Sequence, residues 1–573
     1  MRKRLLSFMM FLPVTMSISA QIDLDLPGLT SPKNVKVTDV GRYTEFLAET
    51  LLTDSLTGRQ DTVYQSVPEV VWQSEGEDIY RDTQAPRRAL SPIKLKGDLH
   101  KFFANLTIYL FKFTYESIDS EGKPIRLSGI AATPNPKQTK EVNNMLIGTH
   151  ITITSNAETP SNQTSKLDLT DWGVLFSMAS GKPTEIATGV KVGRVIIGLL
   201  SAGLSEVAWS TTDLIRNAQF NKYRHNFVVM PDYEGYGETV NRAHPYLYQE
   251  LTARQVVDGA RAAYYAYNND AGLKSIHLNF RKDWKSAICG YSQGGSVAMA
   301  TQRFLEQNNL DEELHLTGSI CGDGPYDPIA TLMYYVGSDQ MDKIMSMPVV
   351  LPLIVKGMLD TNPYMRSHKA ADYFNPKFLE TGIMDWIGSK KMSTGDIEDA
   401  FKKLYNEGKN GDKNYYRDIL EPNGSAKMRK IMNQNCYEYF LDKYNRYKDK
   451  YKTKEGIPLP DKRGVMEDLH LALASNDITN GWTPRHHILL FHSTGDTTVP
   501  YDNAERAVAQ LGSWAVLHKA DNKQDHIESG KDFFRGDSNA GVFFHDNLRI
   551  SSAMRAIMGL PYKGQKSGDI KSW

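Results

Sequence analysis

Five short apolar runs, separated by helical segments, constrain the fold of this chain more than any other feature. They are NNMLIGTHI (143–151), NFVVMPD (226–232), KSAICG (285–290), LTGSICG (316–322) and HILLFHS (487–493). The segment LTARQVVDGARAAYYAY (251–267), between the second and third runs, has helical spacing. Strands that are apolar throughout and alternate with helices predict a parallel sheet buried on both faces.

Two further strands precede these runs. TIYLFKFTYESI (107–118) and IRLSGIAATP (125–134) flank the turn DSEGKP, which predicts an antiparallel hairpin. The alternation then stops from residue 328 to 482, where helical stretches such as DIEDAFKKLYNEG (396–408) are separated by polar turns. Because a structureless loop of this length is rare in a compact domain, we expect a helical cap inserted between two strands. The predicted fold is therefore α/β, with a mostly parallel sheet opened by a hairpin.

The N-terminus has the pattern of a secretory signal peptide. MRKR is followed by the apolar run LLSFMMFLPV and by the small residues of TMSISA, with cleavage expected after about Ala20. We expect a soluble, secreted or periplasmic protein. No later segment has the 18 uninterrupted apolar residues expected of a transmembrane helix.

Composition narrows the function classes. Lys and Arg together number 67, as do Asp and Glu, so no global charge favours nucleic acid. The three cysteines are too few for a disulfide framework, and we assign them no chemistry.

The stretch ICGYSQGGSVAMA (288–300) places Ser292 between a buried strand and a helix. Gly290 and Gly294 flank the serine in the pattern G-x-S-x-G, which permits the tight strand-to-helix turn of a nucleophile elbow. A context of buried strand, turn and helix makes this motif more specific than the five letters alone. Ser292 is the candidate nucleophile.

A serine nucleophile requires a histidine oriented by a carboxylate, and in elbow enzymes both follow the serine. Asp496 lies in the turn after the run HILLFHS and is the preferred acid, with Asp323 in CGDGPYD as the alternative. The preferred base is His526, in a polar segment expected to form a loop, whereas His518 is assigned to the last strand.

The other components are less sharply defined. The backbone N–H of Gln293 is one expected oxyanion donor, and Thr152 in the loop GTHITITSNAETP (148–160) is proposed as the second. His486, His487 and His492 could form a metal site, but strand alternation explains them more simply. We expect neither a metal nor a cofactor.

The apolar run MPVVLPLIVKGML (347–359) could line a substrate pocket or form internal core.

Together these residues resemble the α/β-hydrolase superfamily and, more narrowly, its secretory lipase family of serine esterases. The resemblance is carried by VVMPDYEGYGET (228–239), HPYL (244–247), VVDGARAA (256–263), GYSQGG (290–295), HSTGDTTVP (492–500) and His526. It implies a triad of Ser292, Asp496 and His526 under a helical lid, and acyl transfer from a small-molecule or lipid ester. The sequence GTHITIT departs from the His-Gly pair common in such enzymes.

The sequence patterns and the resemblance together predict a division of the chain. We expect a signal peptide at 1–20, an N-terminal segment of unassigned role at 21–100, a catalytic α/β-hydrolase domain at 101–327 and 483–573, and a cap at 328–482. Two other functions stay open: a serine exopeptidase of the prolyl-oligopeptidase type, and a non-catalytic binding protein on the same scaffold. The sequence does not indicate an oligomeric state.

Overall fold

The main feature of the fold is one ten-stranded sheet in the order β12-β11-β10-β9-β6-β7-β4-β3-β1-β2. The computed structural model describes residues 32, 34–53, 60–80, 107–137, 139–162, 226–340, 347–520 and 524–535. The strands are β1 (Lys36–Thr53), β2 (Gln60–Trp72), β3 (Thr107–Ile118), β4 (Pro124–Pro134), β5 (Glu141–Val142), β6 (Met145–Thr149), β7 (Phe227–Pro231), β8 (Asn279–Phe280), β9 (Ser286–Tyr291), β10 (Leu316–Gly322), β11 (His487–Ser493) and β12 (Ala515–Ala520). β5 and β8 form a separate two-stranded sheet.

Strand direction confirms the predicted fold class. β3 and β4 form the antiparallel hairpin, and β4 is also antiparallel to β7. From β7 onward, the neighbours β6, β9, β10, β11 and β12 are all parallel. All five apolar runs therefore contribute strands to one sheet, and their carboxyl ends meet at the same edge.

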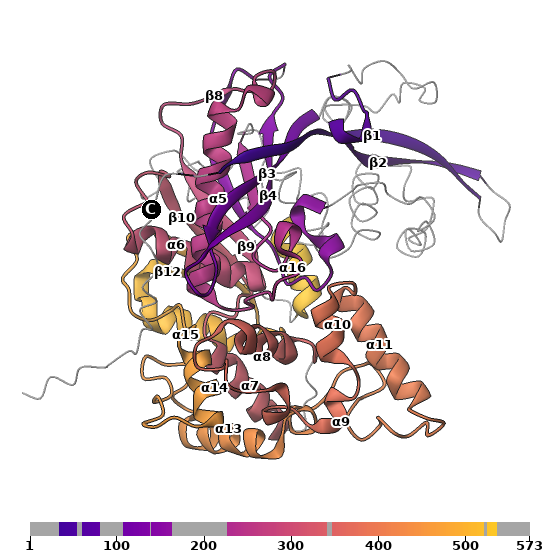
Figure 1. Cartoon of the computed structure of the whole chain (residues 1–573), viewed down its shortest axis with the longest axis vertical. Helices are drawn as coiled ribbons and strands as arrows, with labels where there is room; N and C mark the ends of the chain where they lie inside the picture. Colours follow the sequence, from indigo (N-terminus) through magenta and orange to yellow (C-terminus); the bar gives the residue numbers. More distant parts are fainter. Residues whose placement is uncertain are drawn as a thin grey trace, which may run out of the picture.

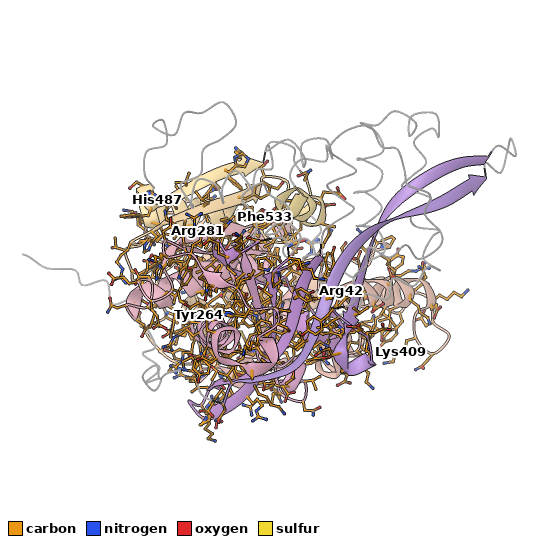
Figure 2. All side chains as sticks on the ribbon, turned by 90° about the horizontal axis from the view of Figure 1, so that it is seen from above. Arg42, Tyr264, Arg281, Lys409, His487 and Phe533 are labelled. Carbon is orange, nitrogen blue, oxygen red and sulfur yellow. The ribbon has the colours of Figure 1, made fainter. Side chains whose placement is uncertain are left out.

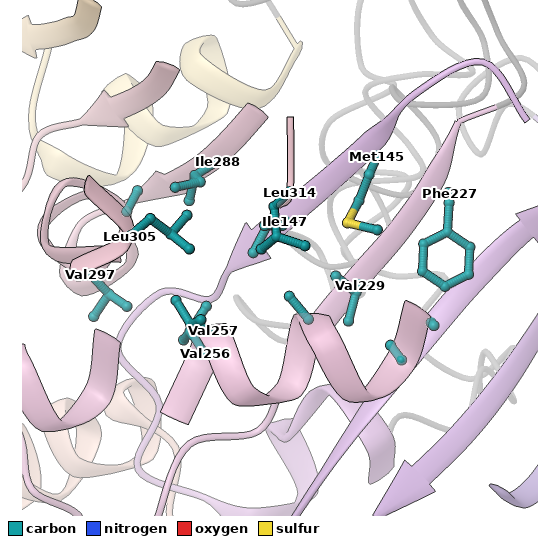
Figure 3. Packing of buried hydrophobic residues seen from close by; sticks show 14 of the residues in the cluster. Met145, Ile147, Phe227, Val229, Val256, Val257, Ile288, Val297, Leu305 and Leu314 are labelled. Carbon is teal, nitrogen blue, oxygen red and sulfur yellow. The ribbon is translucent and has the colours of Figure 1, made fainter. Parts of the chain in front are cut away.

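Both faces of the parallel strands are buried. Ile147, Val229 and Ile288 pack into the core cluster that contains Val256 and Val257 of the helix α5 (Gln249–Asn269). Figure 3 shows this layer, with Val297 and Leu305 of α6 (Gln293–Gln307) alongside. The alternate strand residues belong to a second cluster on the opposite face, which Phe533 of α16 (His526–Arg535) joins: they include Leu146, Val228, Cys289, Leu489 and Phe491.

Helices fill the segment between β10 and β11, and they gather below the sheet in Figure 1. They are α7 (Pro328–Gln340), α8 (Val350–Thr361), α9 (Pro376–Leu379), α10 (Ile383–Ser389), α11 (Thr394–Glu407), α12 (Met428–Ile431), α13 (Gln434–Tyr447) and α14 (Val465–Ala474). Their buried apolar side chains form a cluster separate from those of the sheet. We call residues 328–482 the helical insertion; its standing as a separate domain stays a prediction. α15 (Asp502–Leu511) then lies between β11 and β12.

The N-terminal segment, to which the sequence assigns no role, contributes two strands to the main sheet. Residues 36–44 of β1 pair with β3, while residues 45–53 pair only with β2. This part of the hairpin extends away from the rest of the described chain (Figure 2). The predicted signal peptide lies outside the described residues. Among the described helices, none is long and apolar enough to span a bilayer.

Candidate active site

Ser292 occupies a strained turn between β9 and α6. Its backbone angles, φ 58° and ψ −126°, lie in a region that side-chain-bearing residues rarely adopt. Gly294 packs against the end of β6, where an added Cβ would lie 2.7 Å from the His150 carbonyl oxygen and closer still to that of Thr149. The elbow therefore requires glycine at this position, and the serine hydroxyl is presented at the carboxyl edge of the sheet.

His526 joins Ser292 to Asp496. Its Nε2 lies 2.9 Å from Ser292 Oγ, and its Nδ1 lies 2.5 Å from Asp496 Oδ2. Because the carboxylate can only accept, Nδ1 carries the proton and Nε2 is free to accept from the serine hydroxyl. His526 is the first residue of α16 rather than part of a loop, so the expectation of a loop is wrong.

The Asp496 carboxylate is fixed by its own loop. Its Oδ1 accepts hydrogen bonds from the N–H groups of Thr498 (2.8 Å) and Val499 (2.9 Å). Burial alone would raise the pKa of Asp496, but the charge and hydrogen bond of His526 bring this pKa below its ordinary value. His492 Nε2–H donates to the Val499 carbonyl at 2.8 Å, and this hydrogen bond fixes the loop that carries Asp496.

The alternative acid lies beside this system but not on the histidine. Asp323 follows β10 directly and is fully buried. Tyr291 OH lies 2.9 Å from its Oδ2. Burial, reinforced by the nearby charge of Asp496, raises the pKa of Asp323 well above its ordinary value. In this arrangement Asp496, not Asp323, contacts the His526 ring.

The other histidines predicted to be structural have structural partners. His486 Nδ1 lies 3.1 Å from Glu306 Oε1, and the ring of His487 packs against Trp514. His518 lies in β12 and stacks on Phe491. The carboxylates of Asp323 and Asp496 and the His526 ring could in principle surround a cation. Both ring nitrogens of His526 already face Ser292 and Asp496, so the ring offers no spare ligand atom.

The sequence did not reveal the hydrogen bonds that hold the side chain of Gln293, the residue expected to supply an oxyanion donor. Gln293 is the first residue of α6, where backbone N–H groups have no helical partner. Its side-chain Nε2 donates to His244 Nε2 at 2.9 Å, and His244 Nδ1–H donates to the Glu234 carbonyl at 2.8 Å. Burial lowers the pKa of His244 to about 3, which keeps the ring neutral. The motif HPYL contains this histidine, but nothing in its spacing points to Gln293.

Comparison of the sequence with known protein families and with curated proteins finds no match. Solved structures do match. The rice cell wall degrading esterase LipA from Xanthomonas oryzae has 20% identity and a TM-score of 0.49, with 77% of this chain and 91% of LipA covered. Candida antarctica lipase A in its closed state has 14% identity and a TM-score of 0.40, with 74% of each chain covered.

The sheet itself decides the fold. A serine elbow follows β9, the acid-bearing loop follows β11, and a hairpin opens a sheet that is otherwise parallel. The chain has the α/β-hydrolase fold. Ser292 follows β9 and the Asp496 loop follows β11, so both candidate residues lie at the carboxyl edge of the sheet.

A cavity of about 120 Å³ lies against Ser292 and His526. Thr152, the proposed second oxyanion donor, lines this cavity, and its Oγ1 lies 2.7 Å from Tyr246 OH. The helical insertion supplies much of the apolar wall: Met347, Val349, Val350 and Ile354. Some residues of the run 347–359 thus line the cavity. Others, such as Leu353 and Val355 of α8, lie in the buried cluster of the insertion and do not line it.

Proposed function

We propose that the protein is an exported serine hydrolase that cleaves carboxylic esters through an acyl-enzyme. The observation that supports this most directly is the contact chain from Ser292 Oγ through the His526 ring to Asp496, at the floor of an apolar cavity. A serine hydroxyl becomes a useful nucleophile when a neighbouring base can take its proton. The three groups are buried together and meet this requirement.

In the proposed reaction, Ser292 Oγ attacks the ester carbonyl while His526 Nε2 accepts its proton. Asp496 stabilises the imidazolium that forms, and the N–H of Gln293 donates to the developing oxyanion. His526 then protonates the departing alcohol. Water, deprotonated by the same ring, releases the acid from Ser292 and restores the enzyme.

The cavity supports a short acyl group as the preferred substrate. Its volume of about 120 Å³ is close to the roughly 150 Å³ of an engineered apolar cavity that holds benzene. Esters of two to six carbons, or aryl esters, should therefore be cleaved faster than long-chain ones. A panel of p-nitrophenyl esters from acetate to palmitate tests this; a maximum at palmitate would contradict it.

The exopeptidase alternative makes a different demand on the same cavity. An enzyme that binds a peptide by its N-terminal ammonium needs a negatively charged hydrogen-bond acceptor, such as a carboxylate, in the pocket. The described residues that line the cavity include no Asp or Glu. Aminoacyl-peptide amides should accordingly be poor substrates, and cleavage of these amides without cleavage of esters would favour the exopeptidase.

A fluorophosphonate probe tests the hydrolase proposal without knowledge of the substrate. The wild-type protein should be labelled covalently, whereas Ser292→Ala should not. Ser296→Ala is a matched control, because Ser296 lies in the first turn of α6, the helix that directly follows Ser292, but its hydroxyl donates to the Gln293 carbonyl. Equal labelling of the wild type and Ser292→Ala would rule out Ser292 as the nucleophile. No labelling of the wild type would instead favour the non-catalytic alternative.

Export is tested separately. Expression of the full chain in a bacterium with a secretion pathway should give a mature protein whose first residue is at or near Gln21. Retention of the initial segment MRKR in the product would contradict this part of the proposal.

A further inference from the structure

A second carboxyl group is built into the proposed triad. β9, β10 and β11 end side by side: Gly322 pairs with Tyr291 on one side and with Phe491 on the other. Asp323 follows Gly322 directly and so lies between the nucleophile strand and the acid strand. Oxygen atoms of Asp323 and Asp496 and a ring nitrogen of His526 all lie within 4.8 Å of one another.

The backbone holds Asp323 in this place. Its φ is 36°, in the left-handed region, and its N–H donates to the Phe491 carbonyl at 2.9 Å. The side chain is fully buried. A buried acid with a positive φ at a functional site indicates a constraint beyond simple packing.

The hydrogen-bond donors around the two carboxyl groups are unequal. Asp496 accepts from the N–H groups of Thr498 and Val499 and from His526. Asp323 Oδ1 accepts from the Ser493 N–H at 3.3 Å, and the neighbouring Ser529 hydroxyl also favours the Asp323 anion. Three donors, one of them able to carry a positive charge, stabilise the anion at Asp496 far better than at Asp323.

Tyr291 does not restore the balance at Asp323. Its hydroxyl lies 2.6 Å from the His526 carbonyl oxygen and 2.9 Å from Asp323 Oδ2. The phenol has one proton, and the carbonyl can only accept. The carbonyl and Asp323 Oδ2 therefore share one phenol proton, and Tyr291 gives Asp323 only part of a hydrogen bond.

The remaining groups that interact with the pair do not neutralise a second negative charge. Tyr326 and Tyr291 keep their protons in this buried setting, because burial raises the pKa of each phenol. His492 is neutral, since burial lowers its pKa to about 4. Two buried carboxylates with oxygen atoms within 4.8 Å of each other cannot both ionise without a large penalty, so one proton is shared by the pair.

We infer that Asp323 is a positioning residue of the proposed active site: as a neutral carboxylic acid, it donates a hydrogen bond to Asp496 and holds that carboxylate against His526. The inference rests on the proposed function. The donors described above stabilise the anion at Asp496 more than at Asp323, which assigns the shared proton to Asp323, and the hydrogen bond between the two carboxyl groups orients Asp496.

Two substitutions separate this role from a purely structural one. In Asp323→Asn the amide can still donate to Asp496 and the site's charge is unchanged, so kcat should stay within about fivefold of wild type. In Asp323→Leu the volume is kept but the donor is lost, so kcat should fall about 10- to 100-fold with KM nearly constant. Activity restored by Asn but not by Leu is the expected pattern.

The pH profile gives a readout that packing would not change. If Asp323 is neutral, the acid limb of kcat/KM, which reports His526, should coincide in wild type and Asp323→Asn within about 0.3 pH unit. If Asp323 were an anion, its removal would destabilise the imidazolium and move that limb to lower pH by about one unit or more. Such a shift would overturn the inference, as would full activity of Asp323→Leu.

Infrared difference spectroscopy observes the proton directly and needs no turnover. At neutral pH the wild type minus Asp323→Asn spectrum should contain the C=O stretch of a protonated carboxylic acid, and its absence would also overturn the inference. The rate of fluorophosphonate labelling distinguishes the two proposals. No labelling of the wild type means that the proposed function fails, whereas labelling of the wild type with Asp323→Asn as inert as Asp496→Asn means that only this inference fails.

Discussion

Ser292 and His526 lie 234 positions apart, yet their side chains meet at 2.9 Å. At this residue scale the assignment of the acid is open to a direct test. Asp496→Asn should lower kcat by about a thousandfold or more, because the amide can donate to Nδ1 and favour the wrong histidine tautomer. Asp323→Asn should have a far smaller effect. Steady-state kinetics on variants with an unchanged circular dichroism spectrum decide the matter, and the reverse order of effects would move the catalytic acid to Asp323.

His492 predicts a pH dependence of stability. Burial lowers its pKa to about 4 in the folded state, whereas the unfolded chain takes up a proton near pH 6.5. The unfolded state therefore binds more protons as the pH falls from 6.5 toward 4, and stability is lost in that window. Between pH 7 and pH 5 this residue should cost about 2 kcal/mol.

The variant His492→Gln isolates that contribution, because glutamine can still donate to the Val499 carbonyl but does not titrate. Denaturant unfolding at pH 7 and pH 5 should show a smaller loss of stability for the variant than for the wild type. Parallel losses in both proteins would mean that His492 is not the neutral, buried group described above.

Single residues were predictable where the evidence is local. Ser292 and Asp496 were placed by the short patterns around them, and the structure brings them together with His526. The role of His244 was not predictable, since its partner Gln293 is 49 residues away and no local pattern links the two. The helix beginning at His526 was missed because Gly530 and the polar residues before it are typical of a loop.

Among the elements, the strands and the elbow were the most predictable and α8 the least. Most residues of α8 are apolar, so the sequence does not reveal which of its apolar residues face a pocket. Leu353 and Val355 lie in the buried cluster of the insertion and do not line the cavity, whereas Val350 and Ile354, one turn apart, do.

This geometry predicts which residue of α8 controls chain length. Ile354→Ala should enlarge the cavity and shift the preferred p-nitrophenyl ester toward longer chains. Leu353→Ala is the matched control: it removes a buried side chain of the same helix at a cost of about 2–5 kcal/mol but should leave the preference unchanged. The same profile for both variants would indicate that the acyl chain binds elsewhere.

At the scale of the whole molecule, the sequence predicted the parallel sheet but not how far it extends. The pairing of β1 with β3 joins segments about 70 residues apart, and no pattern within either strand specifies the partner. The position of the helical insertion relative to the sheet was likewise unpredictable in detail, because it depends on charged groups from three separate segments. Asp327 precedes α7, Asp477 follows α14, and Arg506 belongs to α15.

Arg506 joins both ends of the insertion to the sheet domain. Its Nε lies 3.2 Å from Asp327 Oδ2 and its second terminal nitrogen 3.2 Å from Asp477 Oδ2, with all three side chains buried. Breaking a buried network by removing one partner leaves uncompensated charge, so Arg506→Met should cost about 3–5 kcal/mol of unfolding free energy. Burial and the charge of Asp477 raise the pKa of Asp327 to about 7, against the opposing effect of Arg506.

The penalty for Arg506→Met should therefore be larger at pH 8, where Asp327 is an anion, than at pH 5.5, where protonation of Asp327 removes one of the two charges that Arg506 compensates. Arg446→Met is the control, because Arg446 forms an exposed pair with Asp442 within α13 and its loss should cost less than about 0.5 kcal/mol at either pH. Denaturant unfolding of both variants at the two pH values tests the prediction. Equal, small penalties would mean that packing alone, rather than this ion network, fixes the insertion over the active site.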